Sequence, residues 1–200
     1  MVKSFSYKIT SFLICSKTIK DEEYDLYLYG FEILIAFIVN ITAILLMGYT
    51  LNRFNETLLF LICYCPIRQF AGGYHADNYK KCLLVFTLVY LTNMFILEKL
   101  IYNDYAGTIL ICSIMSILGI YFIAPLEHRN NPLSNLDKIK YKNITMIIVS
   151  MIFILSIIGF NFKLTYRLSM YTLSSIICTF IMLILGSIKK WRGKKYEKKF

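Results

Sequence analysis

The chain has 200 residues, of which 58% are hydrophobic and only 17% are charged, and its formal net charge is +10 at pH 7. A soluble domain of this length needs a more polar surface, so the composition excludes a soluble globular protein. The apolar residues gather in blocks that approach the ~20 residues a helix needs to cross a bilayer. The sequence therefore predicts an all-α, polytopic membrane protein with a single domain over residues 1–200.

Residues 1–25 place apolar side chains at helical spacing among lysines, which is typical of an amphipathic helix in the membrane interface. A disordered leader is the alternative. They contain no apolar core followed by a cleavage site, so we expect no removable signal peptide. Membrane spans are predicted at residues 31–51, 54–70, from Cys82 onward, 107–126, 144–162 and 168–188. Residues 127–143 read as a polar loop, and residues 189–200 as a basic tail that contacts anionic lipid around Trp191.

The second predicted span is short, because residues 54–70 reach only ~25 Å as a helix. The distribution of Lys and Arg indicates whether it crosses the membrane. With six spans and both termini in the cytoplasm, 18 of the 22 basic residues lie inside, and 4 lie outside, namely Arg53, Lys99, Lys163 and Arg167. The better five-span arrangement places 15 inside and 7 outside. Since basic residues are retained on the cytoplasmic side, the sequence predicts six transmembrane helices with cytoplasmic ends.

Polar, flexible and nucleophilic residues converge in one stretch, residues 68–82, with the sequence RQFAGGYHADNYKKC. Gly72 and Gly73 permit positive φ angles, so they are expected to end the preceding helix and to bring backbone amides close to a ligand. Asp77 and Asn78 are good N-cap residues for the helix that follows. We therefore expect the next helix to begin near Asn78, with Cys82 in about its first turn.

A cysteine at that position has the surroundings of a nucleophile. A helix N-terminus and the adjacent Lys80 and Lys81 favour the thiolate form of Cys82. On an unbroken helix His75 would stand ~10 Å from Cys82, too far to share a proton. If His75 instead lies on the loop that the glycines create, it can fold back over the helix end and accept the thiol proton.

A metal site is the competing interpretation of this region. Cys63, Cys65, His75 and Cys82 are ligand types that zinc accepts. The Cys-x-Cys pair lies inside an apolar segment and lacks the usual spacing of two to four residues between ligands, so zinc is the weaker alternative. We expect the six cysteines of the chain to be reduced thiols, because most lie in or beside apolar blocks.

The string RQFAGGYHADNYKKC resembles the catalytic region of the AgrB (accessory gene regulator B) membrane endopeptidases of Gram-positive quorum sensing. Arg68, Gly73, His75 and Cys82 match the Arg, Gly, His and Cys positions of that family. The chain length, the multi-span layout, the prolines of the loop around residues 125–133 and the basic C-terminal tail also match. The resemblance implies a cysteine endopeptidase that cuts a propeptide on its C-terminal side, closes the remaining fragment into a thiolactone or lactone, and uses no cofactor or metal.

In this scheme Cys82 would attack the scissile carbonyl, while His75 would take its proton and later protonate the leaving amine. Asp77 would orient the His75 ring, or it serves only as a helix cap. Arg68 would bind a substrate carboxylate or polarise the carbonyl, or it is an arginine that reaches the interface at the end of a span.

Backbone amides around Gly72 and Gly73 and at the start of the third span are candidates for the oxyanion hole, and Gln69 is a further candidate. His128 reads as a solvated loop histidine.

The resemblance also implies the partners. They are an AgrD-like propeptide with an amphipathic helix and an acidic C-terminal tail, anionic membrane lipids and a second copy in a homodimer; no nucleic acid is expected. The basic inner face would attract the acidic tail. The expected location is the bacterial cell membrane, with the active site facing the cytoplasm. A peptide exporter or permease without proteolytic activity is the alternative function.

Overall fold

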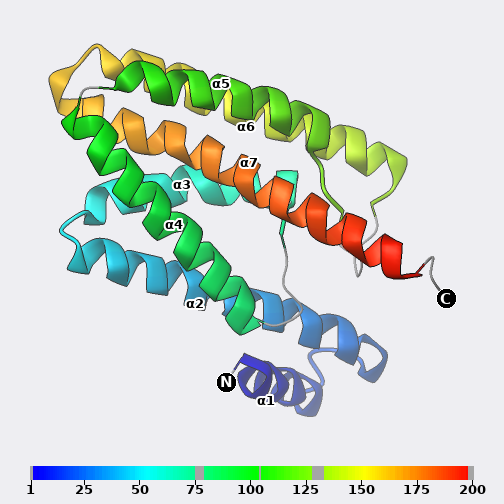
Figure 1. Ribbon diagram of the computed structural model, residues 1–200. Helices are drawn as coiled ribbons and strands as arrows, with labels where there is room; N and C mark the ends of the chain where they lie inside the picture. Colours follow the sequence, from blue (N-terminus) through cyan, green and yellow to red (C-terminus); the bar gives the residue numbers. More distant parts are fainter. Residues whose placement is uncertain (1, 75–78, 104, 128–132, 198–200) are drawn as a thin grey trace.

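The computed structural model describes residues 2–74, 79–103, 105–127 and 133–197, and these residues form an all-α structure (Figure 1). The helices are α1 (Val2–Cys15), α2 (Tyr24–Thr50), α3 (Phe54–Ala71), α4 (Tyr79–Tyr102), α5 (Ala106–Ile123), α6 (Asn135–Phe160) and α7 (Lys163–Glu197), with a 3-10 turn, η1 (Asp21–Glu23), before α2. Extended pairing in the described residues is limited to one isolated bridge, between Gly72 and Leu126. The predicted all-α class is confirmed.

Five of the described helices, α2, α4, α5, α6 and α7, are long and apolar enough to cross a membrane. This confirms a polytopic helical membrane architecture. α3 occupies the predicted short segment almost residue for residue, but its 18 residues include Glu56, Pro66 and Arg68 and are less apolar. Its length of ~27 Å is close to a bilayer core. The sixth span therefore stays a prediction.

The longest helix, α7, lies at the centre of the bundle. In its most apolar window 67% of the residues are buried, compared with 6% in α2. α5 and α6 cover one side of α7, α3 lies on another, and α4 crosses it (Figure 1). Small polar residues make this packing close, because Ser174 and Thr179 are fully buried and donate their hydroxyl protons to backbone carbonyls of α7 itself.

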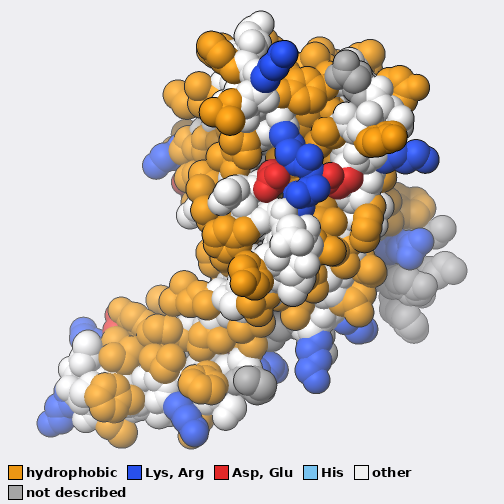
Figure 2. Space-filling model, turned by 90° about the vertical axis from the view of Figure 1, so that its left-hand side faces the viewer, with side chains coloured by type: hydrophobic (Ala, Val, Ile, Leu, Met, Phe, Trp, Pro, Cys, Tyr) orange, Lys and Arg blue, Asp and Glu red, His pale blue; other side chains and the backbone are white. Residues whose placement is uncertain are grey.

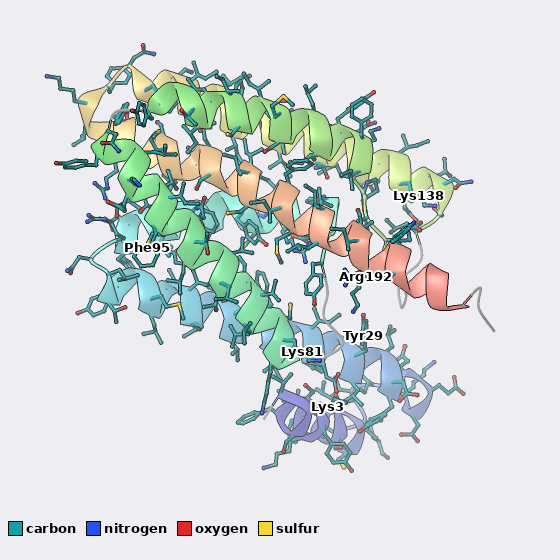
Figure 3. All side chains as sticks on the ribbon, in the orientation of Figure 1. Lys3, Tyr29, Lys81, Phe95, Lys138 and Arg192 are labelled. Carbon is teal, nitrogen blue, oxygen red and sulfur yellow. The ribbon has the colours of Figure 1, made fainter. Side chains whose placement is uncertain are left out.

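The helices alternate in direction, so the bundle has two distinct ends. We call the end at which α3 finishes and α4 and α6 begin the Cys82 end, and the opposite end, at which α3, α5 and α7 begin, the Glu98 end. Lys138 on α6 and Arg192 on α7 lie at the Cys82 end, whereas Phe95 lies toward the other (Figure 3).

A cluster of charges, the Glu98 cluster, joins three helices at the Glu98 end. Its members are Arg53, Glu56, Glu98, Arg167 and Tyr171. Glu98 on α4 accepts hydrogen bonds from Arg53 Nε at 2.9 Å, from the Tyr171 hydroxyl at 2.8 Å and from Arg167. Arg167 Nε also lies 3.0 Å from a carboxylate oxygen of Glu56. Figure 2 looks onto this end and shows acidic and basic side chains together, surrounded by hydrophobic ones.

The N-terminal segment forms α1, which packs on α2 and stands out from the rest of the bundle (Figures 1 and 2). α1 exposes Phe5 and Phe12 beside its lysines, and the Tyr7 ring meets Tyr24 edge-on at a centroid distance of 6.5 Å. The predicted helical conformation is therefore present. Its place in the membrane interface stays a prediction.

One predicted boundary is wrong. The expected loop 127–143 ends at Ser134, because the Ser134 hydroxyl accepts a hydrogen bond from the Asp137 amide and caps α6 from Asn135 onward. The described part of the expected tail 189–200 is helical, because α7 continues without a break to Glu197, and its contact with anionic lipid stays a prediction. A row of basic residues is compatible with helix wherever no Pro or capping Gly ends it.

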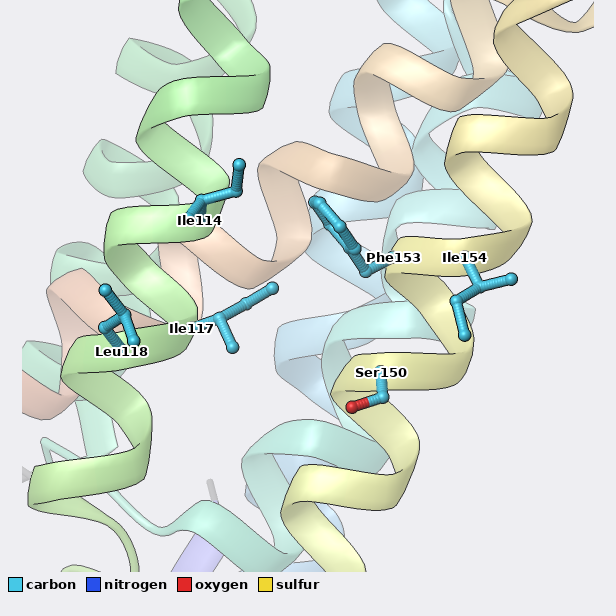
Figure 4. A pocket seen from close by; sticks show the side chains of 6 residues that line it. All are labelled: Ile114, Ile117, Leu118, Ser150, Phe153 and Ile154. Atoms are coloured by element: carbon cyan, nitrogen blue, oxygen red, sulfur yellow. The ribbon is translucent and has the colours of Figure 1, made fainter.

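α5 and α6 enclose an apolar groove of about 330 Å³ near the middle of their lengths (Figure 4). Its lining consists of Ile114, Ile117, Leu118, Ser150, Phe153 and Ile154. These side chains carry no titratable group, so the groove has none of the chemistry predicted for residues 68–82.

Candidate active site

The candidate site begins where α3 ends. Gly72 and Gly73 adopt φ angles of 74° and 133°, in the positive region that residues other than glycine avoid, and the helix stops at Ala71. The Gly72 amide still donates to the Arg68 carbonyl at 3.1 Å, which closes the last turn. The predicted role of the two glycines in breaking the helix is confirmed.

Arg68 holds the segment that follows the helix. Its guanidinium donates one hydrogen bond to the Gly72 carbonyl and another to the Tyr74 carbonyl. The planar fork of an arginine suits two acceptors side by side. A Cβ at Gly73 would stand 1.8 Å from Arg68 Nη1, so a side chain there would displace the guanidinium, and the φ of 133° also favours glycine. Arg68 thus fixes the backbone of residues 72–74, a role that the sequence did not predict.

Two further backbone contacts anchor the same segment. The Leu126 amide, in the connection between α5 and α6, donates to the Ala71 carbonyl at 2.9 Å. The Tyr74 amide donates to the Met182 carbonyl of α7, also at 2.9 Å. The start of the loop is therefore held between α7 and the α5–α6 connection. Sequence reasoning did not find Leu126 or Met182, because backbone pairing between distant segments leaves no residue signature.

Cys82 is the fourth residue of α4, so its predicted place in the first turn is confirmed. Its side chain is half-buried. Cys82 shares a helix face with Phe86 and Tyr90, at spacings of four and eight residues, and both of these are buried in the core. The thiol is therefore on the side of α4 that faces the bundle.

A ring contact relates Cys82 to Arg68. Phe86, one turn after Cys82, stacks on Tyr64 of α3 with a centroid distance of 4.9 Å and an interplanar angle of 17°. Tyr64 lies one turn before Arg68. Because α3 and α4 run in opposite directions, Arg68 and Cys82 each lie one turn beyond this stack toward the Cys82 end. His75, Asp77, Asn78 and His128 lie outside the described residues, so their predicted roles stay predictions.

The other predicted candidates are dispersed. Gln69 is exposed, and Cys63 and Cys65 are half-buried on α3. Among the described residues, which do not include His75, no three His, Cys, Asp or Glu side chains are placed to share a metal ion. Cys63, Cys65 and Cys82 thus do not form the cluster that the zinc interpretation required. All six cysteines are free.

Charged side chains at the Cys82 end organise the surroundings of this segment. Glu127, next to Leu126, lies 2.7 Å from the Lys138 ammonium of α6 and 3.6 Å from that of Lys190 on α7. The hydrogen bond with Lys138, helped by the charges of both lysines, lowers the pKa of Glu127. The Lys189 ammonium lies 5.8 Å from the centre of the Tyr74 ring. This end therefore presents positive charge close to the loop that precedes Cys82.

Together these features define a class of protein. It is a polytopic helical membrane protein in which a loop braced by an arginine precedes a helix whose first turn carries a cysteine facing the bundle. Residues 6–188 match the family model described as accessory gene regulator B. The chain belongs to the AgrB family.

Two relatives from Clostridium perfringens strain 13 (Type A) show the extent of the similarity. AgrB-like protein 1 is 32% identical over 147 residues, which cover 73% of this chain and 76% of the relative. AgrB-like protein 2 is 23% identical over 145 residues, which cover 70% and 68%. No solved structure matches the chain. Family membership connects the protein with the accessory gene regulator system of quorum sensing.

Proposed function

We propose that this protein is a membrane-embedded cysteine endopeptidase that processes an AgrD-like quorum-sensing propeptide. Cys82 is the nucleophile and His75 is the general base. The observation that carries the proposal is the position of Cys82 in a chain of this family. The thiol stands in the first turn of α4, on the inward face, just after a loop that Arg68 braces. Membership of the AgrB family connects that site with the peptide signal.

The reaction proceeds in two acyl transfers. His75 takes the Cys82 proton, the sulfur attacks the scissile carbonyl, and the C–N bond breaks as His75 protonates the leaving amine. The C-terminal fragment leaves with a free amino group, and the rest of the peptide remains as a thioester on Cys82. A cysteine or serine of the bound peptide then attacks this thioester while His75 takes its proton, which closes a thiolactone or lactone and releases Cys82 as the thiolate. His75 returns the proton to the Cys82 sulfur. Exclusion of water favours ring closure over hydrolysis.

The structure narrows the choice of oxyanion donors. The Gly72 amide already donates to the Arg68 carbonyl and the Tyr74 amide to Met182. We therefore propose that the Gly73 amide or amides at the start of α4 donate hydrogen bonds to the oxyanion, and that the Gly72 amide does not. Arg68 is assigned to loop positioning, because its guanidinium donates to two backbone carbonyls.

The proposed topology has six spans, with α3 as the short one, and a cytoplasmic Cys82 end. The expected inner cations lie at the Cys82 end, where they include Lys138 and Lys190. The expected outer cations Arg53 and Arg167 lie at the opposite end, and this separation supports the proposed arrangement. The basic end attracts the acidic tail of the propeptide, and anionic lipid of the inner leaflet contacts the same face. A homodimer is part of the proposal.

The test uses the purified full-length protein in liposomes that contain anionic phospholipid, with a synthetic propeptide in excess. Mass spectrometry follows the C-terminal fragment and the adduct on Cys82. Cys82→Ser and His75→Ala should each abolish release of the fragment without changing membrane insertion. Cys112→Ser is the matched control, because Cys112 is an exposed thiol on α5, and it should cleave like the wild type.

The same liposomes distinguish an exporter from a peptidase. An exporter would move the intact propeptide across the bilayer without cutting it. If Cys82→Ser or His75→Ala cleaves at the wild-type rate, or if wild-type protein transports the uncut peptide only, the assignment of a cysteine endopeptidase is wrong.

A further inference from the structure

Gly186 of α7 lies against the first residues of the loop. It is fully enclosed, and a Cβ built there would stand 2.7 Å from the carbonyl carbon of Gly73 and 2.8 Å from the Tyr74 amide nitrogen. It would also meet the Leu126 side chain at 2.5 Å. Real Cβ atoms do not approach backbone this closely, so any larger residue would force the loop away from α7.

The surrounding residues make a three-point face on α7. Met182, Gly186 and Lys189 follow one another at helical spacings of four and three residues and so lie on the same side of the helix. The Met182 carbonyl accepts the hydrogen bond from the Tyr74 amide, and the Lys189 ammonium lies over the Tyr74 ring. Gly186 has no side chain and so leaves room for the backbone of Gly73 and Tyr74. Each of these contacts falls on residue 73 or 74, immediately before His75.

We propose that this face of α7 is the docking surface for residues 73 and 74 and that, through them, Gly186 is a positioning residue for His75. The inference rests on the proposed function of the site and adds that α7 positions the residues directly before His75. Arg68 fixes residues 72–74 from the α3 side, and Gly186 fixes them from the α7 side. His75 follows directly on Tyr74 in the chain.

Gly186→Ala is a sharp test, because alanine is the better helix former and should not weaken α7 itself. Because the substitution changes no charge and leaves the basic residues of the Cys82 end in place, KM should change little. The kcat for propeptide cleavage should fall about 10- to 100-fold, the size expected when a catalytic group is displaced by about 1 Å.

Gly119→Ala is the matched control. Gly119 lies on α5, and a Cβ there would meet the ring of Phe180 on α7, so the change disturbs packing on α7 without touching the loop. It should lower thermal stability and leave kcat near the wild-type value. The double variant Gly186→Ala with Leu126→Ala should stay impaired, because the decisive contacts of Gly186 are with the backbone of Gly73 and Tyr74.

A readout that does not depend on activity completes the experiment. Tyr74→p-benzoylphenylalanine in the full-length protein, irradiated in liposomes, should form adducts on α7 at or near Lys189, beside which the Tyr74 ring lies, and Gly186→Ala should reduce their yield several-fold. Adducts located elsewhere, a wild-type kcat in Gly186→Ala, or recovery of kcat in the double variant would overturn the proposal. If wild-type protein forms the adducts but cleaves no propeptide, the docking surface stands and the proposed function falls.

Discussion

At the scale of single residues, the structure gives Arg68 a role that differs from those predicted from the sequence. An arginine at the end of a membrane span is commonly read as a charge that reaches for phosphate or for a substrate carboxylate. Here the guanidinium donates to the carbonyls of Gly72 and Tyr74, and it fills the space that a side chain at Gly73 would need. Its planar pair of donors is therefore as important as its charge.

Arg68→Lys separates geometry from charge. A lysine ammonium is a point donor on a flexible stem and cannot hold two carbonyls in the fixed arrangement of a guanidinium. We expect kcat for propeptide cleavage to fall by about tenfold or more, with KM nearly unchanged, because the loop loses its brace while the positive charge stays. Steady-state cleavage kinetics in liposomes measure this. Lys163→Gln, at the Glu98 end, is the control, and a wild-type kcat in Arg68→Lys would contradict the role in positioning.

At the scale of elements, the α5–α6 connection links the loop to the rest of the Cys82 end. Leu126 pairs with Ala71, and the adjacent Glu127 carboxylate contacts Lys138 on α6 and Lys190 on α7. The cap at Ser134 starts α6 early enough to bring Lys138 within reach of Glu127. The polar residues that the sequence predicts as one long loop are thus divided between a short connection and the first turns of a helix.

The lowered pKa of Glu127 gives this contact a defined pH dependence. In the unfolded chain Glu127 titrates near the ordinary glutamate value of ~4.3, so its contribution to folding is fully present above that pH. The contribution is lost as the pH falls through the lower pKa of the folded state. Thermal midpoints in detergent should therefore show wild type slightly above Glu127→Gln at neutral pH, and the two should converge in acid.

The contribution is small, because exposed ion pairs are screened by solvent. Glu22→Gln, an exposed position in η1, is the matched control and should show no such convergence. A difference between wild type and Glu127→Gln that grows as the pH falls would contradict the sign of the effect.

At the scale of the whole molecule, the Glu98 cluster ties three helices together at the end opposite Cys82. Glu98 on α4 pairs with Arg53 before α3 and with Arg167 on α7, and Tyr171 donates to the same carboxylate. The side-chain amide of Asn93 on α4 also donates a hydrogen bond to the Ser174 hydroxyl of α7 at 3.1 Å. Since α4 carries Cys82 at its other end, these polar contacts set the register of the helix on which the thiol stands.

Glu98→Gln should therefore loosen α4. The substitution removes the charge that three donors share and leaves Arg53 and Arg167 with Glu56 alone, so we expect a loss of about 1–3 kcal/mol in the free energy of unfolding. The side chains are about one-third exposed, which keeps the loss at the lower end of the range for buried pairs. Unfolding in mixed micelles measures it. Lys99→Gln, exposed on the next residue, should leave stability unchanged, and an equal effect in both variants would argue against the cluster.

Much of this architecture could be predicted from local signals. Apolar blocks long enough to cross a bilayer define the helices, because every backbone group in lipid must bond within its own segment. The short α3 is found within one residue of its predicted end, since Gly72 and Gly73 stop the helix by their own conformational freedom. The first-turn position of Cys82 follows from the same glycines and from the N-cap residues that the sequence shows before it.

Contacts between segments distant in the chain could not be predicted. The roles of Arg68, Met182 and Gly186 depend on which face of α7 meets the end of α3, and hydropathy does not encode helix rotation, because lipid and protein interior are both apolar. Of the Glu98 cluster, the sequence predicted only that Arg53 and Arg167 lie on the same side of the membrane. The sequence by itself determined the class, the helices, the family resemblance and the nucleophile candidate. Only the tertiary structure decided what holds the loop, because that depends on packing and hydrogen bonds between helices far apart in the chain.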